Sequence, residues 1–452
     1  MSNFDYDVVY IGSGHAAFHG AGKLVKKGRK VAVVEADKLG GTCPNYGCDA
    51  KLLLDGPFEV VQDAQNYQGF GLDGQPQINW DDLMDYKKKF INVGLPQMME
   101  QLLPQTGIDI YRGQGSLVDE HTVSAGDKTI TAEYIVLATG QHDSTLPVEG
   151  KEYINNSKDF LDLAKLPQSL VIIGAGLISL EFASMVIKAG VKVDVVEFTG
   201  HALANYYRDY VDKLVAKLEK DGVKFHFNEA VTKIQPEDKE YTVQTKSGLT
   251  LQGEYVLGGT GREVNINGLN LDNLGIKGSP KGIEVNDHLQ TTVPNIYVSG
   301  DAIAKTIPKL TPTATFESNY IAAQILGEDD QPIKYPVVPI IAFTLPRLAE
   351  VGLPITKAKE EPDKYQITKT PYGQGFDTKH DSDAELTLAF NKQTKQVVGA
   401  ALYGEDASYL INILTFVIDK GLTSDDLDQL IFGFPDVSYS ILGSVDPNGL
   451  LG

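Results

Sequence analysis

The chain has 452 residues, of which 42% are hydrophobic and 22% charged, a composition typical of globular rather than disordered or fibrous proteins. Its 60 acidic and 40 basic side chains give a net charge of −20, which disfavours nucleic acid and acidic membrane surfaces as partners. No apolar run reaches the roughly 18 residues of a membrane span, and the acidic start lacks a signal-peptide pattern. We therefore expect a cytoplasmic protein of about two to four domains that binds neither nucleic acid nor membranes.

Cysteine and histidine are both rare. The only cysteines are Cys43 and Cys48, and the last of eight histidines is His380. Two cysteines in so long a chain exclude a disulfide scaffold and an all-cysteine zinc site. Because they lie close together in the sequence, they leave open one local redox pair.

The chain opens with a strand–turn–helix–strand pattern. Residues 6–11 (YDVVYI) predict a strand, the turn GSG follows at 12–14, a helical segment comes next, and a second strand ends at Glu35. Glycine lets the backbone approach a pyrophosphate, which the free N–H groups at the helix start can bind. The terminal carboxylate can accept hydrogen bonds from a ribose.

The same pattern recurs 162 residues later. The strand 169–173 (SLVII) runs into GAG at 174–176, a helix follows, and the next strand ends at Glu197. In both copies the acid follows the first glycine by 23 residues, and the third small residue is Ala17 or Ser179. One fingerprint alone is weak evidence, but two with matched spacing predict that the chain binds two dinucleotides.

Later segments predict further elements around these two units. Apolar spacing predicts a helix within 204–221, and Pro312 in a first-turn position predicts the start of another. From about residue 336 the pattern changes to longer strands and a helix near 407–420, which indicates a separate α+β domain. Further strands are expected at 134–140 (YIVLATG), 255–261 (YVLGGTG) and 296–301 (IYVSGD).

The segment GGTCPNYGC, residues 40–48, follows the first acid. It resembles the GGTCxNxGCxPxK signature of the glutathione reductase, dihydrolipoamide dehydrogenase and mercuric reductase family. Other landmarks of that family are ATG at 138–140, the Gly300-Asp301 pair and LTP at 310–312. The resemblance covers essentially the whole chain. It implies FAD in the first unit, a nicotinamide cofactor in the second, and a homodimer.

The implied fold class is α/β, with two Rossmann-like dinucleotide-binding domains and a C-terminal α+β dimerisation domain. We assign residues 1–146 and 275–335 to FAD binding, 147–274 to NAD binding and 336–452 to dimerisation.

The resemblance also implies residue roles. Cys48 matches the cysteine beside the flavin, and Cys43 matches the interchange cysteine that meets the substrate. Glu181 matches the acid of an ion pair near the flavin, and Thr311 opens a helix aimed at it. The positions that match cofactor-binding residues are Gly12, Gly14, Ala17, Glu35, Gly41, Thr42, Gly115, Thr139, Gly140, Asp301 and Thr311 in the FAD unit, with Gly174, Gly176, Glu197 and Gly261 in the second unit.

The lysine of that ion pair is displaced. The family places it four residues after the second cysteine, where this chain has Leu52. Lys51 is one residue short, so on a helix its side chain starts about 100° away. Two interpretations stay open: its long stem reaches Glu181, or it is an ordinary solvated lysine.

Charge predicts the choice of nicotinamide cofactor. Relatives selective for NADPH place arginines at positions that correspond here to Glu197 and Leu203. A carboxylate accepts from the free 2′-hydroxyl of NADH and repels a 2′-phosphate. We expect NADH rather than NADPH, although His201 lies close enough in sequence to meet a phosphate.

The C-terminal segment departs from the family. Thiol–disulfide members carry a His-Glu pair there that moves protons, whereas residues 433–439 read GFPDVSY. Phe434 stands at the histidine position and Tyr439 at the glutamate position. Phenylalanine cannot titrate, tyrosine with a pKa near ~10 is a poor base, and Asp436 is a poor acid at pH 7. We expect a non-standard proton path and an unidentified small-molecule acceptor: a quinone, a metal ion, oxygen or an unusual disulfide.

Three alternatives stay open. The first is the ketopropyl-coenzyme M oxidoreductase/carboxylase branch, which also replaces the histidine with phenylalanine and shares the Thr-Cys-Pro opening of the redox motif. Against it, this chain has Tyr439 where that branch has a histidine, and it lacks the extra insertions of that branch. A dihydrolipoamide dehydrogenase or glutathione reductase with a relocated base is the second. A non-catalytic flavoprotein is the third. No resident metal is expected.

Overall fold

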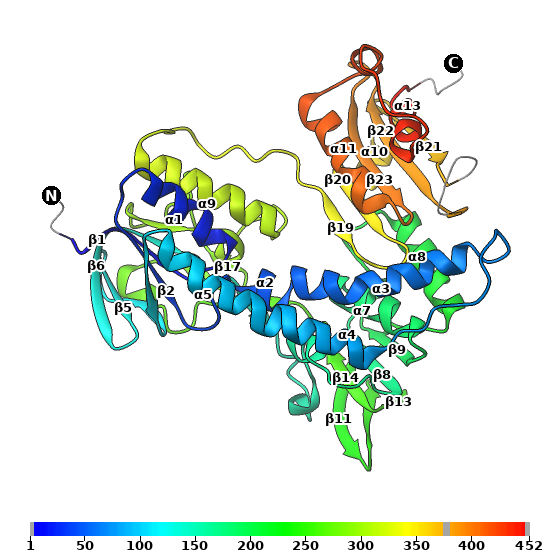
Figure 1. Cartoon of the computed structure of the whole chain (residues 1–452), viewed down its shortest axis with the longest axis horizontal. Coiled ribbons are helices and arrows are strands. Elements are labelled where there is room, and N and C mark those ends of the chain that lie inside the picture. Colours follow the sequence, from blue (N-terminus) through cyan, green and yellow to red (C-terminus); the bar gives the residue numbers. More distant parts are fainter. Residues whose placement is uncertain (1–3, 374–379, 448–452) are drawn as a thin grey trace.

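A computed structural model describes residues 4–373 and 380–447. Its first sheet holds parallel strands in the order β3-β2-β1-β6, and β18 pairs with β6 (Figure 1). The predicted first strand and the strand ending at Glu35 are therefore confirmed as neighbours. The bounds are β1 Tyr6–Ile11, β2 Val31–Glu35, β3 Ile108–Arg112, β6 Lys128–Leu137 and β18 Ile296–Val298.

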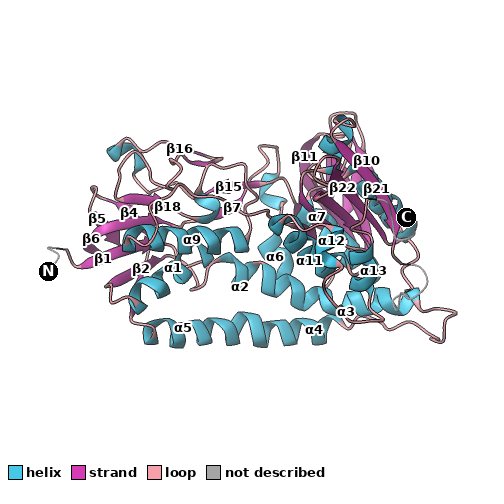
Figure 2. Cartoon of the chain, turned by 90° about the horizontal axis from the view of Figure 1, so that it is seen from above, coloured by secondary structure: helices cyan, strands magenta, loops and turns pink. Residues whose placement is uncertain are grey.

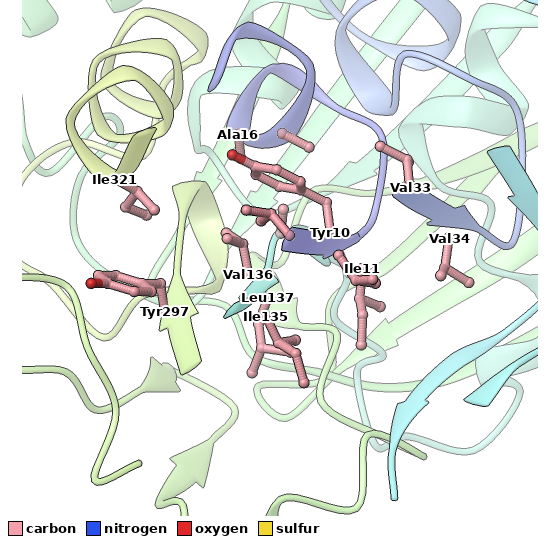
Figure 3. Packing of buried hydrophobic residues seen from close by; sticks show 14 of the residues in the cluster. Tyr10, Ile11, Ala16, Val33, Val34, Ile135, Val136, Leu137, Tyr297 and Ile321 are labelled. Atoms are coloured by element: carbon pink, nitrogen blue, oxygen red, sulfur yellow. The ribbon is translucent and has the colours of Figure 1, made fainter. Parts of the chain in front are cut away.

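The core of this sheet is apolar on both faces. Strand β1 is buried almost throughout, as expected for a parallel strand covered on two sides. Figure 3 shows Tyr10 and Ile11 packed among Val33, Val136 and Leu137 of the neighbouring strands. Helices α1 (His15–Lys26) and α9 (Thr311–Leu326) pack against each other, although nearly 300 residues separate them in the chain.

Helices α2 to α5 lie along one side of the molecule and extend from the first unit towards the second (Figure 2). Helix α3 begins at Cys48 and packs against both α2 and α7, so it joins the two dinucleotide-type units. A π-helical segment, Lys88–Gly94, connects α4 to α5. The bounds are α2 Thr42–Tyr46, α3 Cys48–Asn66, α4 Trp80–Lys87 and α5 Leu95–Gln105.

The second sheet repeats the first. Its four parallel strands follow the order β10-β9-β8-β14, so the predicted internal repeat is confirmed. Helix α8 (Arg208–Asp221) lies within the predicted range 204–221. The bounds are β8 Ser169–Ile173, α7 Leu177–Lys188, β9 Lys192–Glu197, β10 Lys224–Phe227 and β14 Tyr255–Gly258, with an antiparallel sheet of β11 Val231–Glu237, β12 Glu240–Thr245 and β13 Thr250–Gly253.

The third sheet is antiparallel, in the order β19-β20-β23-β22-β21. Helix α11 (Ala407–Lys420) packs on it, as predicted for residues 407–420. Among the longer strands expected after residue 336, the apolar run 336–343 (PVVPIIAF) pairs only over Ile340–Ala342, as β19, and is therefore shorter than expected. The other bounds are β20 Leu348–Gly352, β21 Tyr365–Pro371, β22 Glu385–Asn391, β23 Val397–Tyr403, α10 Ile355–Glu360, α12 Ser424–Leu427 and α13 Val437–Gly443.

One boundary differs from the sequence assignment. Strand β15 (Arg262–Val264) pairs with β7 (Gln141–Asp143), and Val264, Leu269 and Leu271 join the first core. The segment 262–274, which we assigned to the NAD unit, therefore packs with the first unit. Within the described ranges, no helix combines the length and apolar character required to cross a bilayer. The remaining elements are α6 Ser157–Leu161, β4 Gly115–Leu117, β5 Thr122–Ala125, β16 Gly278–Ser279 and β17 Gly282–Ile283.

Candidate active site

The two cysteines lie where consecutive helices begin. Helix α2 begins at Thr42, directly before Cys43, and α3 begins at Cys48. Both are free thiols in hydrogen-bonding contact, and Cys48 Sγ lies 3.5 Å from Thr311 Oγ1 at the start of α9. The structure thus brings together three residues predicted for the site, and it describes both cysteines as thiols.

Their surroundings make the two thiols unequal. The hydrogen bond from Cys43, the Thr311 hydroxyl and the charge of Lys51 lower the pKa of Cys48, although burial opposes them. The same thiol–thiol contact and burial raise the pKa of Cys43. The negative charge of Asp49, next to Cys48 in the chain, raises the pKa of both sulfurs. Cys48 is therefore the sulfur that ionises first, and Cys43 the one that retains its proton.

Lys51 reaches the buried acid. Its Nζ lies 2.9 Å from Glu181 Oε1, and the Glu181 side chain is 3% exposed. Leu52, at the position where the family has its lysine, is 45% exposed. Of the two interpretations of Lys51, the structure supports the one in which its stem reaches Glu181.

The structure adds residues that the sequence analysis missed. Phe343 N donates to Glu181 Oε1 at 2.9 Å, and Lys51 Nζ lies 4.3 Å from the centre of the Phe343 ring. Four residues on, Arg347 donates to both carboxylate oxygens of Asp55 on α3, at 3.2 and 2.6 Å. The segment 343–347 therefore holds the acid of the ion pair and the helix that carries Cys48 and Lys51.

The first glycine turn has a backbone shape that leaves room for a pyrophosphate to approach closely. Gly12 has φ of +105°, and a Cβ atom there would lie 2.3 Å from the carbonyl oxygen of Ala138. A Cβ atom at Gly41 would lie 2.8 Å from Gly14 Cα, so the turn and the GGT loop touch through backbone alone. These glycines leave an open backbone cradle before α1.

The polar groups around this cradle fit a dinucleotide. The N-cap of α1, Gly14, provides no side-chain cap, so its first N–H groups can face a phosphate. Glu35, at the end of β2, accepts from Ser13 N at 2.9 Å and Asp37 N at 2.8 Å. Within the described part of the chain, the buried Thr139 Oγ1 has no hydrogen-bond partner. A buried hydroxyl that lacks a hydrogen-bond partner within the described chain, beside a glycine cradle, is consistent with FAD binding.

The other positions predicted for FAD binding have the following local structure. Asp301 is largely buried, which raises the pKa of its carboxyl against the opposing charges of Lys305 and Arg262. Ala17 is buried and donates its N–H to Gly14 O, and Gly140 has φ of +65°. At Gly115 the chain packs closely, because a Cβ atom there would lie 2.7 Å from Ile11 Cγ2.

The second unit repeats this geometry down to its hydrogen bonds. Gly174 has φ of +97°, Gly176 caps α7 without a side chain, and Gly261 has φ of +109°. Glu197 accepts from Ala175 N and Thr199 N, each at 2.7 Å, as Glu35 does in the first unit. These residues could hold a nicotinamide dinucleotide.

Comparison with known proteins agrees with this geometry. The family model described as pyridine nucleotide-disulphide oxidoreductase matches residues 6–318, and the dimerisation domain of that family matches residues 338–442. The chain belongs to this family. Its members are flavoenzymes with a redox-active disulfide, and the matched dimerisation domain supports a homodimer.

Individual relatives span nearly the whole chain. A mitochondrial dihydrolipoyl dehydrogenase of Dictyostelium discoideum is 32% identical, covering 98% of this chain and 94% of its own. A mercuric reductase of Staphylococcus aureus is 29% identical, covering 94% and 79%. Among solved structures, the HOCl-induced flavoprotein disulfide reductase RclA from Escherichia coli is 27% identical, covers 96% and 98%, and has a TM-score of 0.87.

Against this family background, Phe434 and Tyr439 lie away from the cysteines of their own chain. They flank the start of α13, which lies apart from α2 in both views (Figures 1 and 2). Their rings contact each other with centroids 5.3 Å apart, and they are 66% and 44% exposed. Asp436 accepts from the hydroxyl and N–H of Ser438, which lowers its pKa further, so that it is deprotonated at neutral pH and has no proton to donate.

A buried carboxyl at the junction with the third sheet gives a pH prediction. Glu350 accepts from Tyr207 N, and burial raises its pKa from 4.5 to about 7. The folded state therefore retains a proton that the unfolded chain releases above pH 4.5. This contribution to stability is complete below pH 4.5 and is lost as the pH rises to about 7. Its full size is about 3 kcal/mol.

The measurement is urea unfolding of the wild type and of Glu350→Gln at several pH values. We expect the stability difference between them to fall towards pH 7 and then to level off. Glu284→Gln, an exposed acid, should show no such trend. A difference independent of pH would contradict the raised pKa of Glu350.

Proposed function

We propose that this family member is an NADH-dependent FAD disulfide oxidoreductase. Electrons pass from NADH through FAD to Cys43 and Cys48, and from there to a small-molecule acceptor. The observation that carries the proposal is the unequal pair of thiols beside the Lys51–Glu181 ion pair. FAD, when bound, accepts a hydride from the nicotinamide and passes an electron pair to the disulfide.

The chain's own residues would divide the remaining work. Lys51 and the first N–H groups of α9 place positive charge near Cys48 and favour its thiolate. Cys43 retains its proton and faces the acceptor. Residues Gly12, Gly14 and Glu35 would hold FAD, and Gly174, Gly176 and Glu197 would hold NADH.

The acceptor follows from the altered proton path. Reduction of a disulfide requires a proton for each leaving thiolate. Phe434 has no ionisable proton, and Asp436, with its lowered pKa, is deprotonated at neutral pH, so neither can supply one. We propose an acceptor whose reduction does not depend on general-acid catalysis by this segment: a quinone, a metal ion, oxygen or an unusual small disulfide. The relatives described above are named as a dehydrogenase and reductases, so they give the carboxylase alternative no support. We further propose a cytoplasmic homodimer.

The test is an anaerobic titration of the FAD-loaded protein with NADH, followed by absorbance. We expect a long-wavelength band from the Cys48 thiolate beside oxidised flavin. Cys48→Ser should abolish the band, whereas Cys43→Ser should retain it and lose turnover. Flavin reduction in the wild type without the band would show that the disulfide lies outside the electron path.

A gain of function tests the proton path. In Phe434→His/Tyr439→Glu, a histidine supported by a carboxylate is restored, and general acid–base catalysis of this kind contributes about a hundredfold or more. We expect NADH-dependent reduction of oxidised lipoamide to rise roughly a hundredfold, while quinone reduction stays constant. Phe416→His, another exposed aromatic position, is the control. Rapid lipoamide reduction by the wild type would instead support a relocated base.

The choice of nicotinamide depends on Glu197. Replacing it with glutamine removes the charge that repels a 2′-phosphate and retains one acceptor oxygen for Ala175 and Thr199. We expect kcat/KM for NADPH to rise about tenfold relative to that for NADH, the effect of roughly 1.4 kcal/mol. His201→Gln should leave the ratio unchanged, and an NADPH preference in the wild type would contradict the assignment.

A further inference from the structure

Two histidines outside the thiol site face each other on helix α1. His15 and His19 are one helical turn apart, and His15 Nδ1 lies 3.0 Å from His19 Nε2. The hydroxyl of Thr315 on α9 lies 3.4 Å from the same Nδ1. His15 Nδ1 therefore lies within hydrogen-bonding distance of both a second ring nitrogen and a hydroxyl oxygen.

The helices hold this arrangement rigidly. Gly20 lies on α1 next to His19, and a Cβ atom there would lie 2.4 Å from the carbonyl oxygen of Ser318 on α9. Gly20 N donates to Ser318 Oγ at 2.9 Å, so the two helices are in backbone-close contact. Phe18 packs against both imidazole rings, with centroids 4.7 and 4.3 Å away.

Lys23, one turn beyond His19 on α1, does not place an uncompensated positive charge beside the two imidazoles. Its Nζ is paired with Glu328 at 2.9 Å, which offsets its charge. Metal ligation requires a neutral imidazole, the usual form of a histidine side chain at pH 7.

The spacing of the nitrogens matches a shared ion. Nitrogens bound at about 2.0–2.1 Å lie about 2.9 Å apart at a right angle and about 3.3 Å apart at the tetrahedral angle. The observed 3.0 Å lies between these values. Imidazole is a ligand that suits zinc, copper and nickel.

We propose that His15 Nδ1 and His19 Nε2 chelate one divalent transition-metal ion, Zn²⁺, Ni²⁺ or Cu²⁺, beside the hydroxyl of Thr315. Among the described residues, no group of three or more His, Cys, Asp or Glu is placed so that it could hold a metal ion, so the proposed site has two imidazole ligands and water would complete the coordination. The proposal is independent of the acceptor, since it uses neither Cys43 nor Cys48.

The test is calorimetric titration of the FAD-loaded homodimer with Ni²⁺ and Zn²⁺, in a Cys43→Ser/Cys48→Ser background that removes the thiol ligands. We expect one ion per chain. His15→Gln and His19→Gln should each remove this equivalent, whereas His288→Gln, at a half-buried histidine elsewhere on the surface, should retain it.

A second measurement covers the case in which His15→Gln disturbs the adjacent glycine turn. Cu²⁺ bound to the same background should show hyperfine coupling to two imidazole nitrogens in electron paramagnetic resonance, and to fewer in His19→Gln. Binding of the same stoichiometry and affinity in His19→Gln and its parent, or no binding by the parent, would overturn the proposal.

Discussion

Replacing Arg347 with methionine should lower the free energy of unfolding by about 3–5 kcal/mol. Arg347 is 2% exposed and donates two hydrogen bonds to Asp55, which is 1% exposed, while Glu59 lies 3.5 Å from the same guanidinium. Removing the cation leaves the Asp55 carboxylate buried without its partner. The cost is mainly the desolvation of that unpaired charge.

Denaturant unfolding of the FAD-loaded protein measures this effect. The double variant Arg347→Met/Asp55→Leu should recover much of the loss, because apolar groups of similar volume often replace a buried ion pair without penalty. Lys277→Met breaks an exposed pair at 3.9 Å and should change little. If Arg347→Met has the same free energy of unfolding as the wild type, or if the double variant is no more stable than the single one, the ion pair is not what holds α3.

The repeat was predictable because its signals are local. A glycine turn at 12–14 and an acid at Glu35 lie within a single strand–helix–strand unit, and Glu35 accepts a hydrogen bond from Ser13 N inside that unit. The second copy at 174–176 and Glu197 follows the same rules. The fold class, the two dinucleotide cradles and the neighbourhood of Cys43 and Cys48 could therefore be inferred from sequence.

The contacts that join distant segments could not. Phe343 and Arg347 approach α3 from almost 300 residues away, and no periodic pattern in residues 343–347 indicates that they meet Glu181 and Asp55. The sequence offers only a weak indication that Asp55 lies near the site: it follows Cys48 by seven residues and so shares its helix face. Likewise, segment 262–274 joins the first core through strand β15, whose partner β7 lies in the first unit.

The position of Lys51 could not be decided by an angular argument. A start about 100° from the family's position left both a solvated lysine and one that reaches Glu181 open, because four methylene groups and the burial of Glu181 decide where the ammonium lies. Helix α3 presents Lys51 towards α7 and leaves Leu52 exposed. The residue type at the family's position is therefore less informative here than the face of the helix.

Lys51→Met should slow flavin reduction by NADH about a hundredfold, the usual cost of removing a charge-stabilising group from a water-poor site. The ammonium neutralises Glu181 and also lowers the pKa of Cys48, so the variant should in addition require a higher pH to form the Cys48 thiolate. Stopped-flow absorbance measures the first effect, and a pH titration of the long-wavelength band measures the second. Lys51→Arg, which keeps the charge, should retain most of the rate.

The double variant Lys51→Leu/Leu52→Lys separates charge from position. It returns the lysine to the family's sequence position without changing composition. Because the side chain of residue 52 is 45% exposed, a lysine there should point to solvent, and the variant should be as slow as Lys51→Met. A wild-type rate in the swapped protein would mean that either helix position can deliver the ammonium to Glu181. A wild-type rate in Lys51→Met would mean that the ion pair has no part in flavin reduction, and its contacts with Phe343 and Glu181 would then serve only to hold α3 in place.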